Sequence, residues 1–151
     1  MNLFVFGTLL IDEIVLGLLN TVPERRAATL QGYRRGNIEI PGRVGKGPAI
    51  VASQHDHVKG DVLVGLTEGQ VKILDLFESV SPGYQRIEGH VETVSGGLCA
   101  ASFYASTSEI AEFVSATDWL IDTFTRDYLD DYVTQRIPNL MAGWKSQGLI
   151  G

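Results

Sequence analysis

Six short segments along the chain are rich in β-branched, apolar and aromatic residues, and most are bounded by glycine, proline, serine or asparagine. Segments of this kind are typical of β-strands. The sequence therefore predicts strands at 2–6, 27–33, 48–52, 58–66, 84–94 and 98–105. Seventeen glycines in 151 residues supply the turns and bends that a closed or strongly coiled sheet requires. This pattern favours a small β-barrel over an open parallel sheet.

Two helices are expected beside these strands. In "TEGQVKILDLFESV", Thr67 and Gln70 have the spacing of a capping box, in which each side chain accepts a hydrogen bond from the other residue's backbone N–H. A helix should therefore begin there. In "TDWLIDTFTRDYLDDYVTQRI", apolar residues recur at helical spacing and acidic residues stand in the first turns. This second pattern predicts a C-terminal helix over about 117–135.

Length and composition limit the possible functions. A chain of 151 residues that is 44% apolar can bury one proper core, so a single domain over residues 1–151 is expected. The formal charge of −6 disfavours nucleic acid, whose binding depends on Lys and Arg neutralising phosphates. Cys99 is the single cysteine, which fits a reducing, cytoplasmic setting. Asp12 and Glu13 interrupt the first apolar run, so neither a signal peptide nor a membrane span is expected.

Glu78 projects onto the apolar face of the helix that follows Thr67. At about 100° per residue, Val71, Leu74 and Phe77 form one stripe, and Glu78 falls between Val71 and Leu74. Three interpretations stay open. The carboxyl reaches water at a frayed helix end, it pairs with a cation such as Arg86, or it lines a cavity where burial raises its pKa. The last interpretation is the chemical one, because such a group shuttles protons near neutral pH.

The turn after the first expected strand reads Phe6-Gly7-Thr8-Leu9. Glycine lets the backbone take conformations that other residues resist, and Thr8 can cap the amphipathic segment after the turn. A strand-to-helix turn of this kind aims backbone N–H groups in one direction, which suits an anion or a developing oxyanion. An ordinary strand-ending turn is the alternative interpretation.

Several motifs in the first two thirds of the chain occur together in one known family. The turn after the first strand is followed by "LQGYRR", "VKGDVLVGLTEGQVKILDLFE" and "GYQRIEGHVETV". In this order and spacing, from residue 1 to about 94, the chain resembles the γ-glutamylcyclotransferase-like proteins, which include γ-glutamylamine cyclotransferases and plant avirulence-induced proteins. The acidic "DWLIDTFTRDYLDDYV" is similar to the family's helical tail.

The resemblance implies an α+β fold in which helices flank a small mixed β-barrel. It implies an enzyme that cyclises a γ-glutamyl group to 5-oxoproline and releases an amine or amino acid, with no cofactor or metal. By the resemblance Glu78 is the general acid/base, and Phe6, Gly7, Thr8 and Leu9 hold the substrate. Tyr84 matches an aromatic residue that borders the pocket. The expected partner is a small γ-glutamyl compound, and the chain is expected to be a monomer or a homodimer.

Two departures from the family pattern qualify this comparison. Phe6 replaces the usual Tyr and so lacks its hydroxyl, and the "SVSPG" link before Tyr84 is longer than the commonest form. Two alternatives remain beside the cyclotransferase. One is a related γ-glutamyl or aminoacyl acyltransferase on the same scaffold. The other is a non-catalytic module that binds a small molecule or a peptide end.

Three polar motifs are weaker candidates. "GRVGKGPA" lacks the Ser or Thr that follows Lys in a phosphate-binding loop, and His55 and His57 lack further metal ligands beyond Asp56. Arg34 and Arg35 form a basic pair at a strand end, which is either solvated or available to an anionic substrate at the mouth of a pocket.

Overall fold

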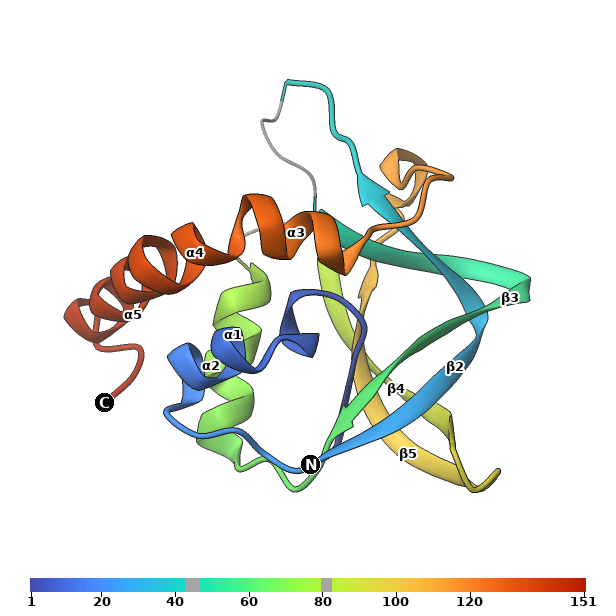
Figure 1. The fold of residues 1–151 in the computed structure, drawn as a ribbon, viewed down its shortest axis with the longest axis horizontal. Helices are drawn as coiled ribbons and strands as arrows, with labels where there is room; N and C mark the ends of the chain where they lie inside the picture. Colours follow the sequence, from blue (N-terminus) through green and yellow to red (C-terminus); the bar gives the residue numbers. More distant parts are fainter. Residues whose placement is uncertain (43–46, 80–82) are drawn as a thin grey trace.

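A computed structural model describes residues 1–42, 47–79 and 83–151 of the chain. Lys46 and the 80–82 link before Tyr84 lie outside the described residues. Five strands close into a barrel in the order β1-β3-β2-β4-β5 (Figure 1). β1 (Leu3–Val5) is parallel to β5 (Leu98–Ser106) and antiparallel to β3 (Gly47–Leu63), so the barrel is mixed as expected. β2 (Arg25–Ile38) and β4 (Tyr84–Thr93) pair antiparallel with each other and with their remaining neighbours.

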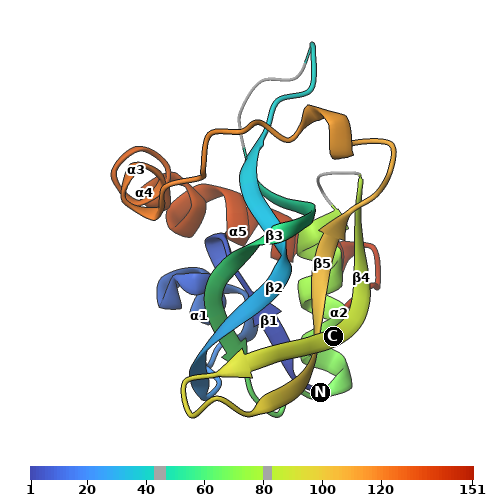
Figure 2. The same cartoon turned by 90° about the vertical axis from the view of Figure 1, so that its right-hand side faces the viewer.

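Two of the predicted strands, 48–52 and 58–66, are one continuous strand. β3 runs through the polar "SQHDH" stretch, which resembles a loop in composition. These polar residues are mostly exposed on the barrel wall, so a strand accommodates them without burying charge. The pairing of β2 with β3 shifts register between Gln31 and Tyr33, where Gly32 has a φ of 82°. This irregularity lets the two long strands curve together across the barrel (Figure 2).

The first strand is apolar at every position because it is covered on both faces. Phe4 belongs to the core inside the barrel, together with residues such as Leu30, Ile50 and Phe103. Leu3 and Val5 belong to a second core, between the barrel and the helices. β1 therefore joins the two cores, and the turn that follows it begins at their junction.

The two N-terminal helices and α2 cover one side of the barrel (Figure 1). A 3₁₀ turn, η1 (Thr8–Leu10), leads into α1 (Asp12–Leu19). The predicted capping box is confirmed at the start of α2 (Glu68–Ser79). The Thr67 N–H donates to Gln70 Oε1 at 3.0 Å, and the Gln70 N–H donates to Thr67 Oγ1 at 3.1 Å.

The C-terminal helix departs from the predicted range of 117–135. It consists of α3 (Ile121–Asp127), α4 (Leu129–Asp131), a π-helical turn η3 (Tyr132–Arg136) and α5 (Ile137–Ser146). It starts later because the Asn37 amide binds the carbonyls of Thr117 and Asp118 and holds that segment against β2. It continues past Pro138 because that proline directly follows the π-helical turn, where the regular hydrogen bonding of an α-helix is already interrupted.

The C-terminal helices extend away from the barrel over α1 and α2, and α5 contacts α1 (Figure 1). None of the helices in the described ranges has the length and apolar character needed to cross a bilayer.

Candidate active site

One pocket gathers all six residues that the family resemblance assigns to the site. Phe6, Gly7, Thr8, Leu9, Glu78 and Tyr84 line it together. The remaining lining residues come from β1, the start of β3, the end of α2, β5 and the C-terminal helices: Phe4, Val5, Gly47, Pro48, Phe77, Tyr104, Tyr132, Arg136 and Leu140. The barrel thus brings together segments from both ends of the chain.

Two arginines bind the carbonyl groups at the two ends of the turn at residues 6–9. Arg35 Nη1 donates to the Phe6 carbonyl at 2.6 Å, and Arg25 Nη2 donates to the Leu9 carbonyl at 2.7 Å. Arg35 is fixed in turn by Asp118, through bonds of 2.8 and 3.2 Å, and its guanidinium lies 5.6 Å from the centre of the Trp119 ring. The ends of the turn are therefore held by side chains from β2.

The inner carbonyls of the turn are also satisfied. The Gly7 carbonyl accepts from the Leu10 N–H at 2.9 Å, and the Thr8 carbonyl accepts from the Ile11 N–H at 3.1 Å. By contrast, the N–H groups of Gly7, Thr8 and Leu9 meet no acceptor among residues 1–42, 47–79 and 83–151. A turn with its carbonyls occupied and its donors open presents partial positive charge at the pocket wall.

Gly7 is required by the close approach of Pro48. A Cβ on Gly7 would overlap the Cγ atom of Pro48 and lie 2.9 Å from its Cβ. Gly7 has a φ of −134° and a ψ of −126°, a pair that lies outside both the helical and the extended regions, and this agrees with the expected conformation that other residues resist. The Phe6 ring is buried in the barrel core and stacks on Phe4, with ring centroids 6.4 Å apart.

Glu78 stands on the last turn of α2 with a half-buried side chain. Burial raises the pKa of its carboxyl from 4.5 to about 7, and the nearby Asp75 carboxylate adds to the rise. The proposed pairing with Arg86 is wrong, because Arg86 binds Asp75 instead through bonds of 2.9 and 3.2 Å. Of the three interpretations, the geometry supports the carboxyl that lines a cavity.

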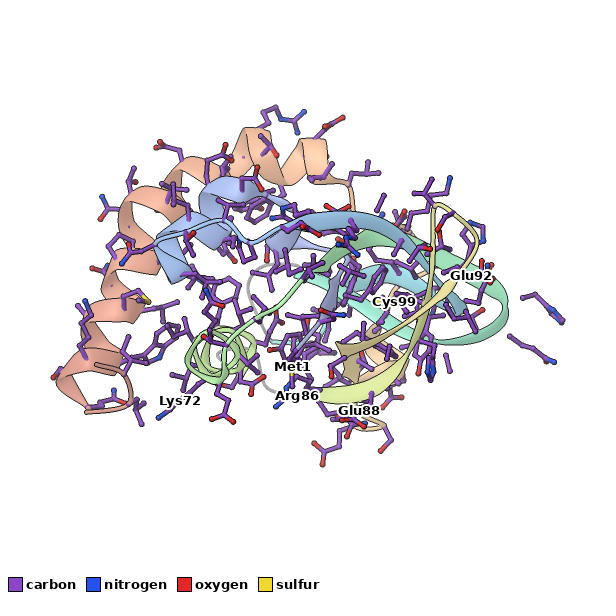
Figure 3. The ribbon with its side chains drawn as sticks, turned by 90° about the horizontal axis from the view of Figure 1, so that it is seen from below. Met1, Lys72, Arg86, Glu88, Glu92 and Cys99 are labelled. Carbon is purple, nitrogen blue, oxygen red and sulfur yellow. The ribbon has the colours of Figure 1, made fainter. Side chains whose placement is uncertain are left out.

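Asp75 is held by hydrogen bonds within its own network. Besides Arg86, it accepts a hydrogen bond of 2.6 Å from the Tyr104 hydroxyl, and burial together with this bond raises the pKa of Tyr104. Figure 3 shows Arg86 near Met1 beside α2, and Lys72 on the side of α2 that points away from the barrel. Arg86 therefore pairs with Asp75, and of these two carboxyl groups it is Glu78 that lines the pocket.

Comparison with known proteins assigns the chain to a family. The profile described as "Gamma-glutamyl cyclotransferase, AIG2-like" matches residues 3–121. The chain belongs to this γ-glutamyl cyclotransferase, AIG2-like family. AIG2-like protein D of Arabidopsis thaliana is 41% identical over 85 residues, which cover 56% of this chain and 52% of the relative. AIG2-like protein C of the same plant is 30% identical over 133 residues, covering 88% and 74%. The chain therefore spans about half the length of the first relative.

Solved structures agree on the fold of this AIG2-like chain. A solution structure of an Arabidopsis thaliana protein matches with a TM-score of 0.64 and 23% identity, covering 97% of this chain and 91% of the other. A structure named as a γ-glutamyl cyclotransferase matches with a TM-score of 0.65 and 18% identity, covering 94% and 86%. Because both identities are below 25%, these matches establish the fold alone.

The AIG2-like pocket also contains residues that sequence reasoning missed. Pro48 is one of them, and its carbonyl accepts a hydrogen bond of 3.3 Å from the hydroxyl of the predicted Tyr84. Tyr132 and Arg136 come from the π turn, with the Arg136 guanidinium 4.9 Å from the centre of the Tyr132 ring. A π turn is often found at a functional site, but a sequence pattern does not reveal one.

Other candidates from the sequence do not line this pocket. Arg34 donates to the backbone carbonyls of Ser115 and Val114, at 2.7 and 3.1 Å, and neither it nor Arg35 lines the pocket. His55 and His57 are exposed on β3. In the part of the chain that the structure describes, no group of three or more His, Cys, Asp or Glu side chains is arranged to hold a metal ion.

Proposed function

We propose that this chain is a γ-glutamyl cyclotransferase with Glu78 as its general acid/base. Its substrate carries a γ-glutamyl group, and its products are 5-oxoproline and a released amine or amino acid. The observation that carries the proposal is the placement of Glu78, whose pKa is raised to about 7, in the pocket that is also lined by residues 6–9, the turn with the open N–H groups.

Substrate binding begins with the turn. The N–H groups of Gly7, Thr8 and Leu9 all bind the α-carboxylate of the γ-glutamyl group, or they are divided between that carboxylate and the oxygen of the γ-carbonyl. Anchoring one end of the glutamyl chain folds it so that the α-nitrogen lies over the γ-carbon. Orientation of this kind is worth up to about 7–11 kcal/mol in favourable intramolecular reactions.

Glu78 then moves the protons. Its carboxylate takes a proton from the α-ammonium group, and the freed amine attacks the γ-carbon to give a tetrahedral oxyanion. The γ-carbon to leaving-nitrogen bond breaks as the Glu78 carboxyl protonates that nitrogen. The Glu78 carboxylate that this step regenerates takes the second proton from the ring nitrogen and passes it to the released amine. In all, two protons pass from the α-nitrogen to the leaving nitrogen, and the new bond joins the α-nitrogen to the γ-carbon. A group with a pKa of about 7 both accepts and donates efficiently near neutral pH.

The direct test is 5-oxoproline formation by the purified chain. A panel of γ-glutamyl amines, γ-glutamyl amino acids and glutathione should contain at least one compound that is cyclised. The Glu78→Gln variant keeps the size and hydrogen bonding of the side chain but cannot shuttle a proton, so turnover should fall by about 10²–10⁴-fold. Lys72→Gln, on the outward side of α2, is the matched control and should retain activity.

A second candidate function has a distinct signature in the same experiment. Phe6 lacks the hydroxyl of the usual family tyrosine. A module that binds its ligand without catalysis tolerates the loss of this hydroxyl. Absence of 5-oxoproline across the panel, with 5-oxoproline or a γ-glutamyl compound still raising the Tm of the chain, would favour that module.

A further inference from the structure

Arg136 brings a positive charge to the pocket wall from the C-terminal helices. It ends the π turn at Tyr132–Arg136, and it lines the pocket together with Tyr132. Its guanidinium lies 4.9 Å from the centre of the Tyr132 ring, a cation–π distance that holds the charged group over that ring. The pocket therefore contains a held cation as well as the Glu78 carboxyl.

Within the described ranges, Arg136 is the arginine without an oxygen partner. The other arginines in those ranges each donate to a carboxylate or a backbone carbonyl: Arg25, Arg26, Arg34, Arg35, Arg86 and Arg126. This contrast is notable in a chain with 18 acidic and 12 basic residues, where carboxylates are plentiful. The fork of Arg136 donors is thus open to oxygens of a ligand.

Arg136 does not act as the counter-ion of Glu78. No ion pair joins the two side chains among the described residues, and the pKa of Glu78 is raised first by burial and second by the Asp75 charge. Tyr132, however, feels both groups, because Arg136 lowers and Glu78 raises the pKa of its hydroxyl, which burial raises most. Glu78, Tyr132 and Arg136 line the same pocket. In a substrate that is held by the turn at residues 6–9 and reacts beside Glu78, the part left to contact the guanidinium is the part beyond the reacting carbonyl.

We propose that Arg136 binds a carboxylate on the group that the reaction releases. The preferred substrates are then γ-glutamyl amino acids or γ-glutamyl peptides, in preference to γ-glutamyl amines that lack this carboxylate. The inference rests on the proposed cyclotransferase function. In that scheme the turn at residues 6–9 holds the substrate's own α-carboxylate, which leaves the second carboxylate for Arg136. A planar guanidinium suits it because the two groups form paired hydrogen bonds.

Two substrates that differ only by this carboxylate test the proposal. γ-Glutamylalanine and γ-glutamylethylamine release alanine and ethylamine, and the second amine is the first without its carboxylate. Wild-type protein should show a kcat/KM that is about 10- to 100-fold higher for γ-glutamylalanine, the range expected for hydrogen bonds to a charged group. Arg136→Met should remove this preference by lowering kcat/KM for γ-glutamylalanine alone, and Arg136→Lys should restore part of it.

A matched control separates this effect from a general change of charge. Arg126→Met removes one positive charge from the same helical segment, but Arg126 pairs with Asp127, is 73% exposed and does not line the pocket. It should leave the preference unchanged. Equal kcat/KM values for the two substrates in wild-type protein, or an equal loss for both in Arg136→Met at an unchanged Tm, would overturn the proposal.

A binding measurement distinguishes this proposal from the proposed activity. Calorimetry with the Glu78→Gln variant compares the two ligands without turnover. Tighter binding of γ-glutamylalanine that Arg136→Met abolishes supports the Arg136 site even if wild-type protein forms no 5-oxoproline. Equal affinity for both ligands, or no binding of either, overturns it.

Discussion

Arg35 Nη1 donates a hydrogen bond of 2.6 Å to the carbonyl oxygen of Phe6. In a trans peptide the carbonyl and the following N–H point in opposite directions, so this bond fixes the direction of the Gly7 N–H. The same guanidinium is tied to Asp118 and stacks on Trp119, both in the segment that leads into the C-terminal helices. Arg35 therefore connects the orientation of the pocket turn to the position of that segment.

Loss of this contact should loosen the turn. Arg35→Met removes the donor to Phe6, and we expect kcat/KM for a γ-glutamyl substrate to fall by about 10- to 100-fold, the cost of a charge-assisted hydrogen bond. The loss should appear mainly in KM, because Glu78 is untouched. Arg34→Met is the control from the adjacent position of β2, since Arg34 binds the carbonyls of Ser115 and Val114 and not the turn. Equal kinetic effects of the two variants would show that Arg35 acts only through stability.

Gly7→Ala should damage the pocket through Pro48. The added methyl would overlap the proline ring, and an overpacked site of this kind typically costs about 1–3 kcal/mol. Chemical denaturation should show the loss, together with reduced turnover. A second change, Pro48→Gly, removes the overlapping ring atoms and should recover part of the stability in a double-mutant cycle. Gly143→Ala has open space around its new Cβ and should lose none. Additive effects of the two changes at 7 and 48 would rule out the contact.

The local parts of the site could be predicted from the sequence. The capping box at Thr67 sets where α2 begins, and helical periodicity from that point places Glu78 toward the core. The apolar first strand and the turn after it are likewise local features. Each is fixed by residues a few positions apart, which a single sequence records directly.

The long-range parts could not be predicted in this way. The partners of the turn, Arg25 and Arg35, and the wall residues Tyr104 and Arg136 reach the pocket through closure of the barrel and the path of the C-terminal helices. The pair at 34–35 has the composition of a solvated strand end, although both side chains are committed to backbone carbonyls. The extension of the last helix past Pro138 depends on the π turn, which has no signature in the sequence.

Glu78 should lower the stability of the folded chain at high pH. Its carboxyl ionises near 4.5 when unfolded and near 7 when folded, so between these values the folded chain retains a proton that the unfolded chain has lost. Stability therefore falls as pH rises through this window, and the full cost remains above about pH 7. The neutral amide of Glu78→Gln avoids this cost.

Denaturation of wild type and Glu78→Gln at several pH values measures the cost. The two should be close at pH 4, and the variant should be more stable at pH 8 by about 1–3 kcal/mol, a range that allows for the partial solvent access of the side chain. Glu92→Gln changes an exposed carboxylate on β4 and should show no such trend. A constant difference between Glu78→Gln and wild type across the range would contradict a raised pKa.

The pH dependence of turnover should follow the ionisation of Glu78 and show the effect of the Asp75 charge on the Glu78 pKa. If the Glu78 carboxylate takes the first proton, kcat/KM should rise about tenfold per pH unit up to about pH 7 and level off above it. Asp75→Asn removes the negative charge beside Glu78, so the midpoint should move to lower pH. It should stay above 4.5 because burial is the larger cause. Arg86→Met leaves Asp75 without its cation and should move the midpoint to higher pH. Initial rates between pH 5 and 9 measure all three profiles, and midpoints that move together in one direction would exclude Asp75 as the group that tunes Glu78.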